Sequence, residues 1–147
     1  MKSKSYHLLK RSSLNVTKAR ERIVSYLLQF EEAVTGLQIE NALKSCCDRS
    51  TIYRNLSAMS KVNLIHRIQL EGESRYKIHP GYLDSRLSIN HPHFECQSCG
   101  RLYCMHSQRI DTSDLPKGFV FKSFNFIIYG ICDKCNNKIK QPLKCNE

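Results

Sequence analysis

Two Cys-x-x-Cys pairs constrain this chain more than any other feature of its sequence. Cys96 and Cys99 form the first pair, Cys132 and Cys135 form the second, and 32 residues lie between the pairs. A two-residue spacer lets two thiolates bind one ion, and two such pairs complete a tetrahedral site with no open position. The spacing therefore predicts a structural zinc site that joins two distant segments. A rubredoxin-like iron site, a redox-active dithiol and a disulfide framework are the alternatives.

Length and charge limit the fold and the partners. The 147 residues are enough for one ordinary domain or two small ones. The formal net charge is +10, and residues 1–80 hold 14 Lys and Arg against 7 Asp and Glu. An anionic partner is expected, either nucleic acid or an acidic membrane surface. No apolar run approaches the roughly 20 residues of a membrane helix, and no signal peptide is visible, so a cytoplasmic protein is predicted.

The hydrophobic pattern of the front half has a helical period. Three helices with Thr or Asp at their N-caps are predicted over residues 17–30, 35–43 and 48–62. The second is expected to bury Leu37, Ile39 and Leu43. The third carries an apolar stripe on one side and a polar, cationic face on the other, formed by Ser50, Arg54, Ser57 and Lys61.

After the third predicted helix the hydrophobic pattern changes to a period of two residues. Residues 64–78 alternate on both sides of a Glu-Gly-Glu turn, which predicts a β-hairpin. Three helices followed by a hairpin are typical of a winged helix-turn-helix, whose third helix enters the DNA major groove. A linker without clear period follows, and a domain boundary is predicted near residue 82. The back half, 83–147, is expected to contain short strands around HFEC and RLYC and a long strand-like run, FVFKSFNFIIYGIC.

These motifs, in this order, resemble the ferric uptake regulator (Fur) family of bacterial metal- and peroxide-responsive repressors. The resemblance rests on TKARERI, DRSTIYRNL, LIHRI, HPHFECQSCG and GICDKC, and it covers nearly the whole chain. It implies an α+β protein, with an N-terminal winged helix-turn-helix domain, 1–82, and a small α/β dimerisation domain, 83–147, that holds the structural zinc. It also implies a homodimer that binds palindromic double-stranded DNA operators.

The resemblance extends to single DNA-binding positions. Arg20, Tyr53 and Arg54 match family residues that lie near DNA, and Ser50 and Thr51 stand beside them at the start of the third helix. Arg54 can donate to a guanine or a phosphate, and Tyr53 offers a ring and a hydroxyl. Partial burial of Tyr53 at the flank of the helix is the alternative.

The family's sensory metal site is altered in this sequence. His91 and His93 keep the family's H-x-H pair, but Ala33, Lys77 and Cys104 stand where the family has a histidine and two acids. We predict that His91, His93 and Cys104 bind a second, regulatory metal at the junction of the domains. Zinc is favoured over iron because two imidazoles and a thiolate form a soft ligand set. The fourth ligand is left open among Glu71, His79, Glu32 and water.

The function predicted from these features is a metal-responsive DNA-binding transcriptional repressor that acts as a homodimer. The alternatives are a Fur-like protein that has lost metal sensing, a CxxC thiol oxidoreductase, and a zinc-ribbon or RNA adaptor. An enzyme is not expected, because no acid–histidine–nucleophile set is visible and the four-cysteine site closes on itself. An adaptor would not explain the polar face of residues 50–61.

Overall fold

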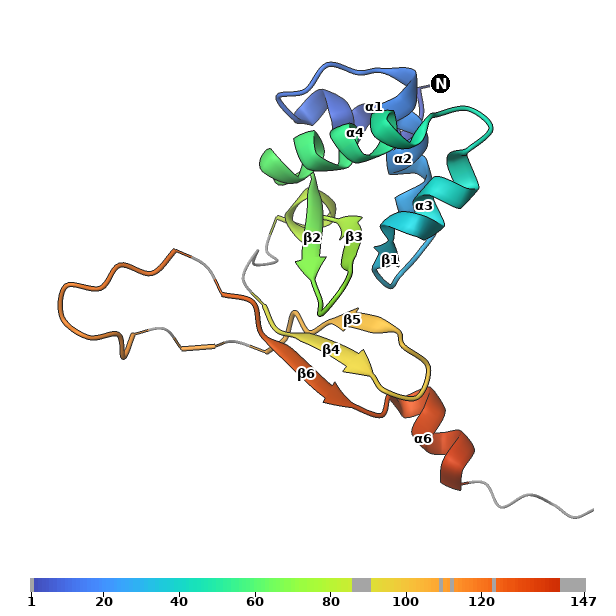
Figure 1. The fold of residues 1–147 in the computed structure, drawn as a ribbon. Helices are drawn as coiled ribbons and strands as arrows, with labels where there is room; N and C mark the ends of the chain where they lie inside the picture. Colours follow the sequence, from blue (N-terminus) through green and yellow to red (C-terminus); the bar gives the residue numbers. More distant parts are fainter. Residues whose placement is uncertain (1, 86–90, 109, 112, 123, 141–147) are drawn as a thin grey trace, which may run out of the picture. The chain divides into compact units, whose positions relative to one another are not determined.

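The protein folds into two compact units, Met1–Ile89 and Asn90–Glu147, in a computed structural model (Figure 1). The structure describes residues 2–85, 91–108, 110–111, 113–122 and 124–140. The boundary lies later than the predicted one near residue 82, because a helix after the hairpin, α5 (Pro80–Leu83), belongs to the first unit. None of the helices in these described ranges is long and apolar enough to cross a membrane.

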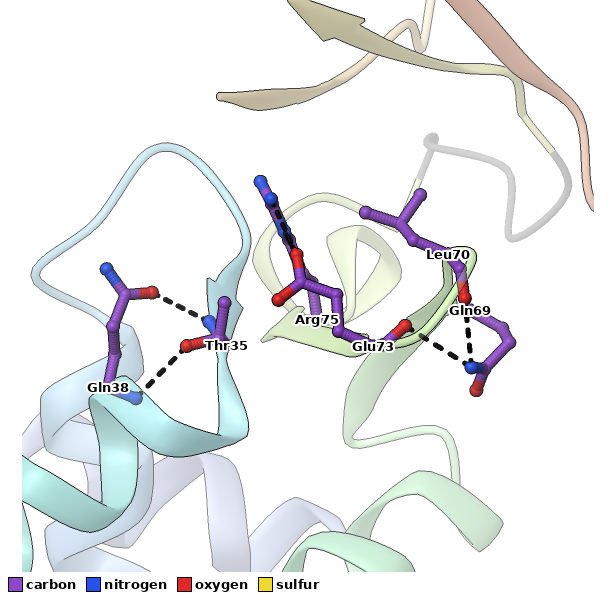
Figure 2. A network of polar contacts seen from close by, with 6 residues as sticks. All are labelled: Thr35, Gln38, Gln69, Leu70, Glu73 and Arg75. Atoms are coloured by element: carbon purple, nitrogen blue, oxygen red, sulfur yellow. Dashed lines mark hydrogen bonds and ion pairs between the residues drawn. The ribbon is translucent and has the colours of Figure 1, made fainter. Parts of the chain in front are cut away.

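The three predicted helices of the first unit are confirmed. They are α2 (Lys18–Leu27), α3 (Gly36–Leu43) and α4 (Arg49–Lys61). The side chains of Thr17, Thr35 and Asp48 cap them by accepting hydrogen bonds from backbone N–H groups of the first turn. At α3 the cap is reciprocal: Gln38 N–H donates to Thr35 Oγ1 at 3.1 Å, and Thr35 N–H donates to Gln38 Oε1 at 2.8 Å (Figure 2).

One burial prediction for α3 is wrong. Ile39 and Leu43 are buried as expected, but Leu37 is 61% exposed. The buried position in the first turn is Gly36, where an added Cβ would lie 2.8 Å from the Tyr53 hydroxyl of α4. Tyr53 therefore packs against the first turn of α3, and Leu37, one residue further along the helix, points to a different side.

A further helix, α1 (Lys4–Arg11), precedes the predicted ones. No helix is predicted for this basic segment from the sequence. Leu8 and Leu9 are buried in the core cluster of this unit, and Ser3 caps the helix by accepting a hydrogen bond from Tyr6 N–H at 3.2 Å. The charged side chains of Lys4, Lys10 and Arg11 stay exposed, so the basic residues lie on the outer face of a packed helix.

The predicted hairpin is confirmed and gains a third strand. β2 (Ile65–Gln69) pairs antiparallel with β3 (Ser74–Ile78), and the two-residue β1 (Val34–Thr35) pairs with the other edge of β3. Gly72 has φ +80° in the turn, a conformation that favours glycine. Around it, Gln69 donates to the carbonyls of Leu70 and Glu73, and Glu73 pairs with Arg75 (Figure 2).

The second unit is a three-stranded sheet followed by a helix. β4 (His93–Cys96) lies in the centre, antiparallel to β5 (Leu102–Cys104) and parallel to β6 (Ile127–Gly130), and α6 (Asp133–Lys140) follows β6. Strands around HFEC and RLYC are therefore confirmed. The strand-like run is shorter than predicted, since in the described part of 119–132 only β6 is paired, and α6 was not predicted.

The core of the first unit generates a stability prediction for α4. Leu56 lies in the fully buried stripe with Ile52 and Met59, whereas Ser57 is exposed. We expect Leu56→Ala to lower the free energy of unfolding by about 2–5 kcal/mol, because it removes buried methyl groups and leaves a cavity. Ser57→Ala, the matched control, should change it by less than about 0.5 kcal/mol. Denaturant unfolding of both variants measures this, and equal effects would contradict the assignment of the two faces.

Candidate metal centres and nucleic-acid interface

The four predicted zinc cysteines come from both ends of the second unit. Cys96 ends β4 and Cys99 lies in the turn before β5, where Gly100 has φ +68° and donates its N–H to the Cys96 carbonyl at 2.7 Å. Cys132 immediately precedes α6, and Cys135 lies in its first turn. Parallel pairing of β6 with β4 brings these two segments together, and Gln97 N–H donates to the Gly130 carbonyl at 2.8 Å beside them.

The geometry of this cluster suits one tetrahedral ion. The four sulfurs lie within 4.8 Å of one another, and those of Cys99 and Cys132 are 3.9 Å apart. A tetrahedral zinc with Zn–S bonds of about 2.3 Å requires sulfur–sulfur edges of roughly 3.8 Å. Cys96 and Cys132 are buried, so the site is closed on the side of the sheet. The ligand set fits a structural ion without an open position.

Backbone N–H groups favour the thiolate forms of two of these cysteines. The Cys132 N–H donates to Cys96 Sγ at 3.3 Å, and this bond, followed by backbone N–H groups of Cys99 and Ser98, lowers the pKa of Cys96 to about 6. The Cys135 N–H is the main cause that lowers the pKa of Cys132. At Cys135 the Ser98 hydroxyl acts to lower the pKa, but the neighbouring thiols and burial together raise it to about 11. The thiolate form is thus favoured at Cys96 and Cys132, and a bound cation would favour it at Cys135 as well.

The second predicted metal cluster lies at the opposite end of β4, which begins at His93 and ends at Cys96. His93 of β4 stands directly opposite Cys104 of β5, so their side chains share one face. The ring centroids of His91 and His93 are 4.7 Å apart, and the ligand atoms of His91, His93 and Cys104 lie within 4.8 Å of one another. His91 and His93 are 2% and 4% exposed, so they are not surface residues. The structure brings together all three predicted residues.

His106 is a neighbour of this cluster that the sequence reasoning missed. Its ring centroid lies 4.3 Å from that of His91. The sequence does contain a pattern that points to His106, because Cys104-x-His106 repeats the two-residue spacing of His91-x-His93. The N–H of Met105 donates to the Pro92 carbonyl at 2.9 Å, which continues the β4–β5 pairing to the level of these residues.

Ala33, Lys77 and His79, the first-unit positions considered for the sensory site, have structural roles in that unit. Ala33 is buried. Lys77 lies on β3 and its ammonium donates to the Glu31 carbonyl. His79 caps α5, and its Nδ1 accepts from Gly81 N–H at 3.0 Å. This bond places the ring proton on Nε2, which makes His79 in this form a poor metal ligand.

The outer face of α4 is a candidate nucleic-acid interface. Ser50, Arg54, Ser57 and Lys61 are all exposed, opposite the buried stripe, as predicted. Asp48 anchors the first turn by accepting from Ser50 Oγ at 2.6 Å, Thr51 Oγ1 at 2.7 Å and Thr51 N–H at 2.9 Å. These bonds hold the pKa of the Asp48 carboxyl well below its usual value, and the bond from the Ser50 hydroxyl has the largest effect. The hydroxyl oxygens of Ser50 and Thr51 keep acceptor capacity toward an outside donor.

Tyr53 is partly buried at the flank of α4. Partial burial is the alternative to a DNA contact that the sequence left open for this residue. Its ring packs against the core cluster and Gly36, and the Arg49 guanidinium lies 5.6 Å from the ring centroid. Burial, followed by the charge of Glu40, raises the pKa of its hydroxyl. Tyr53 therefore has a packing role whether or not it also touches DNA.

Arg20 connects α2 with α4. Its Nε donates to Asn55 Oδ1 at 3.0 Å and its Nη1 to the Asn15 carbonyl at 2.7 Å, while Asn55 Nδ2 donates to the Thr51 carbonyl at 2.8 Å. The guanidinium is thus held close to the first turn of α4. Arg54, in contrast, is exposed and makes one long bond, from Nη2 to Thr51 Oγ1 at 3.4 Å.

Comparison with known proteins gives one consistent result. The family model described as "Ferric uptake regulator family" matches residues 11–129. The peroxide-responsive repressor PerR of Staphylococcus epidermidis is 22% identical over 138 residues, covering 88% of this chain and 87% of that protein. The ferric uptake regulation protein of Staphylococcus aureus is 23% identical over 136 residues, covering 88% of this chain and 94% of that protein.

Solved structures share the fold. A zinc uptake regulator complexed with zinc and DNA superposes with a TM-score of 0.72, at 15% identity, over 95% of this chain and all of that chain (100%). The ferric uptake regulator of Helicobacter pylori superposes with a TM-score of 0.57, at 20% identity, over 89% of this chain and 88% of that chain. These neighbours support the mixed helix and strand fold predicted from the sequence.

The four-cysteine geometry predicts that the second unit depends on its ion. We expect Cys132→Ser to release about one equivalent of zinc and to leave a monomeric or aggregated protein, because the cysteines join the sheet to α6 in a unit with a thin core. Elemental analysis and sedimentation measure this. Cys46→Ser, which removes an exposed thiol of the first unit, should keep the zinc. A folded, zinc-free Cys132→Ser dimer would show that the ion is dispensable.

Proposed function

The chain belongs to the ferric uptake regulator family, and we propose that it is a metal-responsive transcriptional repressor that binds double-stranded operator DNA as a homodimer in the cytoplasm. The observation that carries this proposal is the outer face of α4. A winged helix-turn-helix places its last helix in the major groove, and this helix presents hydroxyls and cations outward while its opposite side is locked into the core. The related repressors and the DNA-bound zinc uptake regulator support the same reading.

Within this interface we assign direct DNA contact to Arg54, Ser50 and Thr51. Arg54 extends from the exposed face, and a guanidinium can donate two hydrogen bonds to guanine or to a phosphate. Ser50 and Thr51 lie at the N-terminal end of the helix, which in such domains contacts base edges. Arg20 contributes by holding the first turn of α4, and Tyr53 by packing α4 against α3; each has part of its surface left for a phosphate contact.

The homodimer is proposed from the second unit. β4 pairs with one edge of β6, and among the described residues no strand covers the other edge. Large apolar side chains on and around β6 are exposed, namely Phe119, Val120, Phe126, Ile128, Tyr129 and Ile131. An open strand edge beside an exposed apolar surface is typical of an interface with another chain. A second copy would also bring a second recognition helix to a palindromic operator.

Two metal ions are proposed for each chain. Zinc is the structural ion of Cys96, Cys99, Cys132 and Cys135, because four thiolates in a closed tetrahedron suit it and the sulfur spacing matches. A second zinc is proposed at His91, His93 and Cys104, where two imidazoles and a thiolate converge from paired strands. His106 is the candidate for the fourth ligand within the same unit, and it replaces His79 in this role.

The DNA interface is tested by removing one cation from α4. We expect Arg54→Ala to weaken operator binding by about 1–3 kcal/mol without loss of thermal stability, because the side chain is exposed and contributes nothing to the core. Lys138→Ala on α6 removes the same charge from the second unit and serves as control. Fluorescence anisotropy with a selected operator, repeated over salt, measures both. If Arg54→Ala and Lys138→Ala both bind the operator as tightly as the wild type, α4 is not the recognition helix.

The second metal site is tested by a double substitution. Wild-type protein that already holds its structural ion should bind one further zinc, and the His91→Ala/Cys104→Ser variant should not, because only His93 and His106 remain of the four proposed ligands. The matched control, His7→Ala/Cys46→Ser, removes the same two residue types from exposed positions of the first unit. Isothermal titration calorimetry and operator binding are the measurements. A His91→Ala/Cys104→Ser variant that binds zinc and DNA like the wild type would leave these residues with a structural role alone.

A further inference from the structure

Two adjacent cysteines stand at the entrance to α4 and take no part in either metal cluster. Cys46 and Cys47 directly precede Asp48, the N-cap of α4. Cys46 is exposed, whereas Cys47 is half-buried and packs against the core cluster of the first unit. Both line an open pocket of roughly 550 Å³, together with Lys18, Arg22, Lys44 and Thr51. A small molecule can therefore reach the two thiols together.

The contacts around the pair favour the thiol form of Cys47. Arg22 Nη1 donates to the Cys46 carbonyl at 3.2 Å, and Cys46 Sγ donates to the Leu43 carbonyl at 3.3 Å. The Cys46 thiol and the Arg22 guanidinium both lie within hydrogen-bonding reach of the Cys47 thiol. Burial and then the Cys46 thiol raise the pKa of Cys47, and together they outweigh the opposite effect of Arg22.

Chain geometry decides which bond the two sulfurs can share. The Cα atoms of adjacent residues are about 3.8 Å apart, which is shorter than the roughly 4.4–6.8 Å of ordinary disulfides. A direct bond between Cys46 and Cys47 would therefore strain the chain. A larger atom that bonds both sulfurs separates them and relieves this restriction.

Charge decides which larger atom is favoured. Lys18, Arg22 and Lys44 surround the thiols, and the carboxylate of Asp48 is already engaged by Ser50 and Thr51. A divalent cation would approach this basic surface against repulsion, and it would have to displace two protons from the thiols. A neutral trivalent arsenical is not repelled, and its own hydroxyl groups take up the two thiol protons and leave as water. We propose that Cys46 and Cys47 form a dithiol site for neutral trivalent arsenicals, and that occupancy weakens DNA binding by α4.

The chemistry balances without an oxidant. Trihydroxyarsine condenses with both thiols, so that two As–O and two S–H bonds break while two As–S and two O–H bonds form. Two water molecules leave, the product is a neutral cyclic dithioarsenite, and arsenic stays trivalent. No other residue has to accept a proton.

The position of Cys47 couples this site to the recognition helix. Cys47 occupies the residue before the N-cap, where an apolar contact with the core sets the angle at which the chain enters a helix. A shared arsenic atom would draw the Cys47 sulfur toward the exposed Cys46 and out of this contact. Asp48 follows directly, so the cap that orders Ser50 and Thr51 would move with it. This coupling rests on the proposed function of α4.

The test uses the full-length, zinc-loaded protein and phenylarsine oxide as probe. Wild type should take up one equivalent, seen by intact mass, keep its zinc, and lose operator affinity by about fivefold or more, as for disturbance of a helix cap. A small dithiol such as dimercaptopropanol should restore binding. Cys46→Ser should bind DNA normally without the probe, form no stable adduct, and show no loss with it. Cys145→Ser, which removes a thiol of the C-terminal tail, should behave like wild type.

Three results would overturn the proposal. An equal adduct on Cys46→Ser would place the arsenical on other thiols. Zinc release from wild type and Cys46→Ser alike would place its effect at the four-cysteine cluster. A wild-type adduct with unchanged operator affinity would remove the coupling to α4. If the protein without arsenical binds no operator, the proposed function fails instead, and comparison of adducts on wild type and Cys46→Ser still decides the dithiol site.

Discussion

The proposed zinc at the four converging cysteine sulfurs would hold together a unit that has very little hydrophobic core. Among the described residues of Asn90–Glu147, the buried residues of apolar type are Pro92, Leu102 and two of the four cysteines, Cys96 and Cys132. The first unit differs, since fifteen buried residues form its core cluster. A small unit with few buried side chains requires another source of stability, such as a metal or a partner chain. Metal binding and folding are therefore expected to be one process in the second unit and separate processes in the first.

The same constraint explains why the apolar surface of the second unit faces outward. Its sheet is only three strands wide, and the aromatic and aliphatic side chains around β6 remain exposed. In a self-sufficient domain these residues would form the interior. The proposed dimer supplies the missing cover, and the proposed structural zinc keeps β6 in place to receive it. The unit proposed to bind DNA can then stay small, with a core formed by one chain, while two copies of the protein are paired through their second units.

The period of the apolar residues and the capping residues predicted those elements whose formation depends on nearby residues in the sequence. α2, α3, α4 and the β2–β3 hairpin follow from apolar spacing, from Thr17, Thr35 and Asp48 as caps, and from Gly72 in the turn. Elements that depend on distant partners were missed. α1 has only two buried leucines, which are adjacent, and β1 is two residues long. α6 is mostly polar and includes Cys135 of the second CxxC pair, and Ile139 is its one large aliphatic residue, so the sequence shows no apolar stripe there.

Site residues were predictable where the spacing itself carries the chemistry. Both CxxC pairs were identified this way. His91 and His93 were identified from the family resemblance, and the structure brings Cys104 to His93 through the register of β4 and β5. His106 was overlooked because one histidine after a cysteine is a weak pattern without that register. For Leu37 and Tyr53, burial depends on how α3 meets α4 at Gly36, which no period within a single helix encodes.

The parallel pairing of β4 with β6 has a consequence for the order of folding. The β4–β5 turn closes a short loop between His93 and Cys104, whereas pairing His93 with Ile127 closes a loop about three times as long. The longer closure costs about 1 kcal/mol more in chain entropy, and parallel strands cannot form it through a local turn. The Cys96–Cys99 knuckle can thus capture its ion early, with Cys132 and Cys135 arriving later. During synthesis Cys96 and Cys99 also leave the ribosome before Cys132 and Cys135. The proposed zinc could therefore be bound by two ligands before the other two are made.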